Sequence, residues 1–232
     1  MPNNANETGN NLLTVVGLGP GNFNLLTLES YELIRTAKNL RLRTAIHPTV
    51  EELKKRGIKF ASYDEFYDRA ENFAGLYEKI ARDLLTRAQS GEKIVYAVPG
   101  SPLVAERTVA NLRAFAPGYG VNLEIYPGMS FLETLCAKLG IDPIDGLIIA
   151  DAADLGKITA LFFPLVVTQI YDRRIASEAK LQLMELLPDE AEIIYVHNLS
   201  LSDESIRKIP LYEIDRQPDI DHLTSLYVPL GE

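Results

Sequence analysis

Three short loops rich in glycine and proline interrupt the first half of this chain, and each follows an apolar segment typical of a strand. They are loop 1 (Gly17–Gly21), loop 2 (Pro99–Pro102) and loop 3 (Pro127–Ser130). Each leads into a segment with helical character, and this alternation is typical of a parallel sheet covered by helices. Ligands of open parallel sheets bind beyond the carboxyl ends of the strands. The three loops therefore predict the edge at which a binding site forms.

Hydrophobic periodicity predicts the other elements of this half. Strands are expected at Leu12–Val16, Leu40–Ile46, Ile94–Val98 and Leu123–Tyr126, and helices at about Leu26–Ala37 and Leu76–Ala88. Ser101 is a good N-cap and Pro102 suits the first helical position, so a helix is expected to begin there. Ser130 and Glu133 have capping-box spacing and predict a further helix that ends at Gly140.

The pattern changes after Pro143, where strands dominate. Strands are expected at Gly146–Ala150, Leu165–Gln169, Glu192–Val196, Ile209–Glu213 and Ser225–Val228, with one long helix at about Asp172–Leu187. The sequence therefore predicts an α/β fold of two domains. A disordered tail (residues 1–11) precedes an N-terminal parallel α/β domain (12–126), and a C-terminal mixed-sheet α+β domain (127–232) follows, with the boundary near Tyr126–Pro127.

Charge and composition narrow the class of protein. Lys and Arg total 23 and Asp and Glu total 32, a balance of −9 that disfavours nucleic-acid binding. The longest apolar run, Ala160–Val167, has eight residues, whereas a membrane span needs about 20. The amino terminus lacks the features of a signal peptide, so a cytoplasmic location is expected. Cys136 is the single cysteine, which excludes an intramolecular disulfide, and its helical spacing places it in the core.

Loop 1 does not match the common nucleotide-binding motifs. The dinucleotide fingerprint requires a glycine at Asn22, and Pro20 lacks an N–H where a pyrophosphate needs donors. Arg43 and Thr44 stand where an acidic residue would bind a ribose, and no Gly-Lys-Ser/Thr follows the loop. A ligand without phosphate fits better, and S-adenosylmethionine is one such ligand.

The loops together resemble a known family. Val15–Gly21, followed by Leu25–Leu28, resembles the opening signature of the tetrapyrrole (corrin/porphyrin) methylases. Loop 2 stands where that family has a Gly-Asp-Pro-type loop, Tyr126–Ser130 resembles its Pro-Gly-x-Ser/Thr segment, and Gly140–Pro143 resembles its Gly-Ile-Pro segment. The resemblance implies a two-domain fold with an S-adenosylmethionine cleft between the domains, and it extends to about Val228.

Two further segments are similar to a narrower group. Leu42–Pro48 and Thr224–Val228 resemble the methylase half of YabN-type proteins, in which this domain is fused to a MazG-type nucleotide pyrophosphohydrolase. This resemblance implies that the chain is the N-terminal domain of a longer protein whose partner is the fused domain. Relatives form dimers, so a homodimer is also expected.

The family resemblance implies site residues as well. The implied cofactor-binding residues are Pro20, Pro99, Gly100, Ser101, Val104 (one helical turn beyond loop 2), Ser130, Phe131, Gln169 and Leu199. The implied activity is methyl transfer from S-adenosylmethionine to an unidentified acceptor, for which a corrin or porphyrin-like macrocycle is one candidate. No catalytic residue is assigned, because Arg43 and Thr44 replace an acidic residue that uroporphyrinogen methylases have near the end of the second strand. Arg43 and His47 are candidate substrate-binding residues, although for His47 a surface position is the favoured interpretation.

Other interpretations stay open at this point. A binding module that regulates a fused pyrophosphohydrolase is one alternative, and RNA ribose methylation is another that the acidic balance disfavours. The three histidines, His47, His197 and His222, are too far apart in sequence to indicate a metal site. An aromatic group either walls a flat macrocycle or, the favoured reading, packs under a long loop; its members are Phe60, Tyr63, Phe66, Tyr67 and Phe73.

Overall fold

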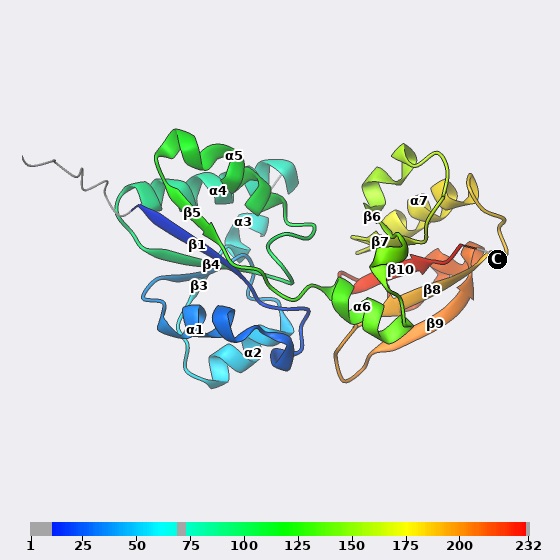
Figure 1. The fold of residues 1–232 in the computed structure, drawn as a ribbon, viewed down its shortest axis with the longest axis horizontal. Helices are drawn as coiled ribbons and strands as arrows, with labels where there is room; N and C mark the ends of the chain where they lie inside the picture. The colour runs from blue at the N-terminus through cyan, green and yellow to red at the C-terminus, as the bar shows by residue number, and fades with distance from the viewer. Residues whose placement is uncertain (1–10, 69–72, 231–232) are drawn as a thin grey trace, which may run out of the picture. The chain divides into compact units, whose positions relative to one another are not determined.

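The computed structural model describes residues 11–68 and 73–230 of the chain. The chain divides by internal contacts into two compact units, Met1–Phe131 and Leu132–Glu232, here called unit 1 and unit 2 (Figure 1). The domain boundary expected near Tyr126–Pro127 stays a prediction. Units defined by their internal contacts need not coincide with domains that fold independently. The expected disordered tail lies outside the described residues except for Asn11.

Unit 1 contains a five-stranded parallel sheet with the order β3-β2-β4-β1-β5. Its strands are β1 (Leu12–Gly17), β2 (Leu40–Leu42), β3 (Ala61–Ser62), β4 (Ile94–Val98) and β5 (Asn122–Ile125). The central strand β1 pairs in parallel with β4 on one side and β5 on the other. Helices cover both faces of the sheet, which explains why β1 is almost entirely apolar and buried along its length.

The helices of unit 1 form two layers. They are η1 (Phe23–Leu25), α1 (Leu28–Thr36), α2 (Pro48–Lys55), α3 (Asp64–Asp68), α4 (Phe73–Gln89) and α5 (Arg107–Tyr119). Helices α1 and α2 lie on one face of the sheet and α4 and α5 on the other (Figure 1). Their apolar side chains belong to two separate core clusters, one on each face. Local signals set two helix starts: Thr27 caps α1 by accepting the Ser30 N–H, and Pro48 begins α2.

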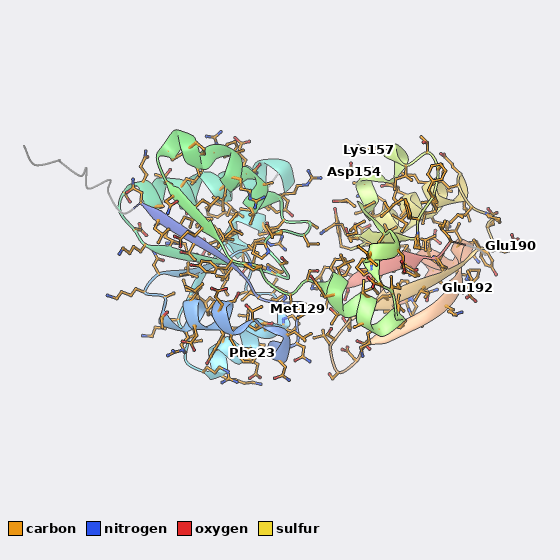
Figure 2. All side chains as sticks on the ribbon, viewed as in Figure 1. Phe23, Met129, Asp154, Lys157, Glu190 and Glu192 are labelled. Carbon is orange, nitrogen blue, oxygen red and sulfur yellow. The ribbon has the colours of Figure 1, made fainter. Side chains whose placement is uncertain are left out.

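Unit 2 contains a five-stranded mixed sheet with the order β6-β7-β10-β8-β9, in which only β6 and β7 pair in parallel. Its elements, with the helix α6 that leads into it, are α6 (Phe131–Leu139), η2 (Pro143–Asp145), β6 (Ile148–Asp151), η3 (Ala152–Lys157), β7 (Leu165–Thr168), α7 (Arg173–Met184), β8 (Glu192–His197), β9 (Ser205–Pro210), η4 (Leu211–Arg216) and β10 (Thr224–Val228). Asp172 caps α7, which packs with η3 and η4 over an apolar core of sheet residues. Figure 2 labels Asp154 and Lys157 of η3, whose side chains form a salt bridge of 2.7 Å.

The structure confirms the predicted fold class, a parallel α/β unit and a mixed-sheet unit, and corrects three element bounds. The strand expected at Leu40–Ile46 ends at Leu42. The strand expected at Ile209–Glu213 is wrong beyond Pro210, where the 3-10 helix η4 begins. The strand there is β9, which starts at Ser205 and has the charged residues Arg207 and Lys208 at its centre. The helix expected from Ser101 begins only at Arg107.

Among the described residues, none of the helices has the length and apolar character that crossing a bilayer requires.

Candidate functional site

The main chains of the three predicted loops meet in unit 1. A Cβ atom on Gly17 would lie 2.3 Å from the Gly100 carbonyl oxygen and 3.2 Å from the Gly128 Cα. A Cβ atom on Gly128 would lie 3.1 Å from the Gly17 Cα. The 2.3 Å separation leaves no room for a side chain at Gly17, whereas a side chain at Gly128 would require its neighbours to move by a few tenths of an ångström. We call this group of Gly17, Gly100 and Gly128 the glycine contact. It lies at the carboxyl ends of the adjacent strands β4, β1 and β5.

Hydrogen bonds join loop 1 to loop 2. The Leu18 N–H donates to the Val98 carbonyl at 2.8 Å, and Gly19 and Gly100 exchange two backbone bonds of 3.2 and 2.9 Å. Gly19 and Gly100 have φ values of +73° and +65°, a region that glycine adopts without strain. The next helices after β1 and β4 pack on opposite faces of the sheet, which makes this edge a topological switch point, the usual place for a ligand.

The structure brings most of the predicted cofactor residues of unit 1 to this edge. Pro20, Pro99 and Gly100 are partly exposed in the joined loops. Ser101 is buried, and its hydroxyl accepts the Leu103 N–H at 3.3 Å. Ser130 is buried at the end of loop 3, and the partly buried Phe131 begins α6. Figure 2 labels Met129 of loop 3 and Phe23, which follows loop 1 in η1.

Val104 does not lie in a helix, contrary to the prediction. Residues 102–105 form a turn in which the Val104 N–H donates to the Ser101 carbonyl at 3.2 Å, and Ala105 has a positive φ of 53°. Glu106 is the residue that caps α5, because its Oε1 accepts the Thr108 N–H at 3.1 Å. The N-cap signal of Ser101 was local, whereas Glu106 is held in place by a distant partner.

That partner is Arg43, which follows β2. Arg43 Nη1 lies 2.9 Å from Glu106 Oε2, and the side chains of Arg43 and Glu106 are 22% and 2% exposed. Burial is the largest single influence on the pKa of Arg43 and acts to lower it, but the Glu106 carboxylate and the neighbouring tyrosines together raise it by more, so the net shift is upward. Tyr67 and Tyr96 lie near this pair, and burial raises the pKa of each phenol.

A second carboxylate lies beside the segment that follows β2. Asp64, at the start of α3, accepts the Thr44 hydroxyl at 2.5 Å and the Ala45 N–H at 2.9 Å. Burial acts to raise the pKa of Asp64, but hydrogen bonds from Ser62, Thr44 and Ala45 outweigh it and lower the pKa. Acidic groups are therefore present near the position where sequence reasoning found only Arg43 and Thr44. Reasoning from the sequence missed Asp64 and Glu106, because both come from other elements.

His47, the second candidate substrate residue, occupies the N-cap position of α2 and is partly buried.

Two predicted cofactor residues, Gln169 and Leu199, belong to unit 2. Backbone with positive φ occurs in the loops that contain them. β7 and β8 both run antiparallel to β10, so their carboxyl ends lie at the same edge. Gln169 after β7 has φ +64°, and Asn198 and Ser200 after β8 have φ +52° and +71°. Within residues 11–68 and 73–230, these three and Ala105 are the non-glycine residues with positive φ. Such strain gathers at functional sites, and here it lies only in loops that follow β4, β7 and β8.

Polar contacts brace the loop that carries Leu199. The Asn198 side chain donates to Asp203 at 2.7 Å, and Glu204 accepts the Ser200 N–H and the Lys138 ammonium, both at 2.7 Å. Leu199 itself is 8% exposed, whereas Gln169 is exposed. The two residues thus share an edge of unit 2 but differ in accessibility.

The two other histidines and the single cysteine lie in unit 2. His197 ends β8 with Nδ1 3.5 Å from Asp219 and Nε2 3.2 Å from Asp221, and His222 is exposed. Cys136 is buried, which raises the pKa of its thiol. In the described ranges, no group of three or more His, Cys, Asp or Glu side chains is arranged to hold a metal ion.

The aromatic group packs, as the favoured reading predicts. Tyr63 is buried and makes edge contacts with Phe66 and Tyr96, with ring centroids 5.1 and 6.1 Å apart. Phe66 and Tyr67 pack against one core cluster and Phe60 against another. The side chain of Phe73 lies outside the described part.

This fold and its glycine loops define a class of protein. Residues 12–215 match the family described as Tetrapyrrole (Corrin/Porphyrin) Methylases, and the chain belongs to that family. Among curated relatives, YabN of Bacillus subtilis (strain 168) is 41% identical over 218 residues. The match covers 94% of this chain and 44% of YabN, so this chain spans less than half the length of that relative.

Solved structures agree on the fold. A cobalt precorrin-4 methyltransferase has a TM-score of 0.70 at 14% identity, and the match covers 98% of each chain. Uroporphyrin-III C-methyltransferase from Thermus thermophilus, complexed with S-adenosylhomocysteine, has a TM-score of 0.69 at 21% identity; the match covers 93% of this chain and 96% of that one. This chain therefore has the same fold as these two methyltransferases.

Proposed function

We propose that this protein binds S-adenosylmethionine at the glycine contact and transfers its methyl group to an acceptor. The glycine contact carries the proposal, because three loops from adjacent strands are held together by main-chain atoms at a switch point of the sheet. Family membership supports the same assignment.

The residues at this edge suit the proposed ligand. Most of its surface is apolar or neutral, so it requires apolar walls and a few neutral hydrogen-bonding groups. Pro20 and Pro99 provide apolar surface, and the backbone of Gly100 and the neighbouring Ser101 provide neutral polar groups. The proposed cofactor residues are Pro20, Pro99, Gly100, Ser101, Val104, Ser130, Phe131, Gln169 and Leu199.

S-adenosylmethionine supplies an electrophilic methyl group already activated by the sulfonium charge. The work left to the chain is to hold the reacting groups in line, to exclude water and to orient the acceptor. Arg43 and His47 are the proposed acceptor-binding residues. The acceptor is unidentified, and a corrin or porphyrin-like macrocycle is the first class to test. Arg43 would meet it as a donor whose charge Glu106 already balances.

Calorimetric titration with S-adenosylhomocysteine tests the binding step. We expect saturable binding by the wild-type protein and much weaker binding by Gly17→Ala, because the new methyl group separates the loops. Gly118→Ala is the matched control, because a Cβ at Gly118 meets nothing within 4 Å. Absence of binding by the wild type at millimolar ligand would overturn the proposal.

A second candidate is a domain that binds S-adenosylmethionine without methyl transfer and regulates a fused nucleotide pyrophosphohydrolase. The buried pairing of Arg43 with Glu106 favours it, since Arg43 is already engaged, and so does the greater length of YabN. A screen with methyl-labelled S-adenosylmethionine and porphyrin, peptide and RNA acceptors separates the two. Labelled product excludes this candidate, and binding without product in every arm favours it.

We also propose a homodimer, which sedimentation equilibrium of the purified chain tests directly. A single species at the monomer mass of 25.8 kDa would contradict it.

A further inference from the structure

Thr49 contacts loop 1 from outside the loop. It is the second residue of α2 and is fully buried. Its Oγ1 lies 3.0 Å from the Leu18 carbonyl oxygen and 3.1 Å from the Gly21 carbonyl oxygen. One hydroxyl therefore spans the loop, with an acceptor on each side of Gly19 and Pro20.

The start and the end of loop 1 are held by different hydrogen bonds. Backbone hydrogen bonds fix Leu18 and Gly19 to the loop 2 side. Pro20 has no N–H, and Gly21 adopts a φ of +126°, which only glycine tolerates well. The Thr49 hydroxyl reaches the far side of the loop, where it contacts the Gly21 carbonyl.

Removing this hydroxyl leaves two buried carbonyl groups without their donor. Leu18 and Gly21 are both buried, so water does not readily replace the lost hydrogen bond. The flexible glycines on either side of Pro20 allow the loop to move toward new partners. Such a movement displaces Pro20 while β1 and α2 stay folded.

From this geometry we propose that Thr49 is a positioning residue for loop 1, holding Pro20 in the conformation that binds S-adenosylmethionine. The inference rests on the proposed function, and Thr49 acts through the backbone without touching the ligand. No sequence motif pointed to it.

The test compares Thr49→Val, which keeps the shape and removes the hydroxyl, with Thr49→Ser, which keeps the hydroxyl. Calorimetry with S-adenosylhomocysteine should show about tenfold weaker binding for Thr49→Val and less than about threefold for Thr49→Ser; tenfold corresponds to about 1.4 kcal/mol. Thr36→Val is the matched control, because Thr36 Oγ1 also donates to a backbone carbonyl, that of Glu32, but at the end of α1. The Thr36→Val protein should bind S-adenosylhomocysteine with wild-type affinity.

Amide hydrogen exchange of the ligand-free proteins gives a second readout. The Gly19 and Gly21 amides should exchange at least about fivefold faster in Thr49→Val than in wild type, while amides of β4 keep their protection. If Thr49→Val does not fold, Thr49→Ala removes the same hydroxyl without adding a methyl group against the carbonyls.

The outcomes are distinguishable. Wild-type affinity together with unchanged exchange in Thr49→Val overturns the positioning role. Failure of the wild type itself to bind S-adenosylhomocysteine overturns the proposed function instead, and the exchange arm still decides whether Thr49 holds the loop. Equal weakening by Thr49→Ser and Thr49→Val also overturns the role, because the hydroxyl would then be irrelevant.

Discussion

Gly17→Ala is the substitution that most directly tests the glycine contact. The added methyl carbon would lie 2.3 Å from the Gly100 carbonyl oxygen, 3.1 Å from the Pro102 Cδ and 3.2 Å from the Gly128 Cα. Two of these three neighbours are backbone atoms and the third belongs to a rigid proline ring, so no side-chain rotation relieves the overlap. The main chains of loops 1 and 2 must separate.

The magnitude follows from the space available at three glycines. Overpacking against a backbone that cannot rotate away costs about 3 kcal/mol, the upper part of the usual range, and this is our value for Gly17→Ala. Gly128→Ala has clearances of 3.1 and 3.2 Å, so a small shift suffices and we expect about 1–2 kcal/mol. Gly118→Ala lies within α5 with nothing inside 4 Å, and better helix propensity should stabilise the protein by about 0.5–1 kcal/mol.

Urea unfolding followed by circular dichroism measures the free energy of unfolding of each variant. Titration of the same samples with S-adenosylhomocysteine measures how much ligand affinity each variant loses. The order of stability should be Gly118→Ala above wild type, then Gly128→Ala, then Gly17→Ala. A Gly17→Ala protein within about 0.5 kcal/mol of wild type, with unchanged affinity, would show that loops 1, 2 and 3 do not meet as described.

Three further outcomes are expected. Arg43→Met leaves the Glu106 carboxylate buried without its partner and should cost about 3–5 kcal/mol in urea unfolding, most of which Glu106→Gln in the same chain restores. Asp64 has a pKa below that of the unfolded chain, so its contribution to stability is complete above about pH 4 and is lost as the pH falls through the folded pKa; Thr44→Val should weaken this acid dependence in unfolding curves recorded across pH. Gln169→Gly relieves a positive φ and should raise the midpoint of thermal unfolding while weakening S-adenosylhomocysteine binding, and a lowered midpoint would argue against strain at this position.

Periodic segments were predictable from the sequence because burial alone specifies them. Ile94–Val98 is found as β4 with the expected bounds, since a short apolar run between Lys93 and Pro99 has few alternatives. The three loops were also predictable, because glycine and proline restrict the backbone locally. The short helices α2 and α3 were missed, since eight and five residues are too few for a clear periodic pattern.

The polar support of the site was not predictable, because it depends on contacts distant in sequence. Arg43 and Glu106 are separated by 63 positions, and Thr49 lies 31 positions from Leu18. Neither pair has a local signature. The start of α5 was misplaced for the same reason. Ser101 carries a local N-cap signal, but Glu106 both caps the helix and forms the ion pair with Arg43.

The hydrogen bonds of Thr49 and Glu106 also explain how the proposed site, made largely of backbone, keeps its shape. Glycines let the loops approach one another, but the same freedom makes the loops costly to order. Thr49 restrains loop 1 from α2, and the buried Glu106 fixes the segment after loop 2 to Arg43. Both anchors lie outside the glycine contact, so a substitution at either can change ligand affinity while the glycine sequence stays intact. Relatives that share the loops but differ at these two anchors should therefore differ in affinity for S-adenosylhomocysteine, and exchanging the anchors between such relatives should transfer the difference.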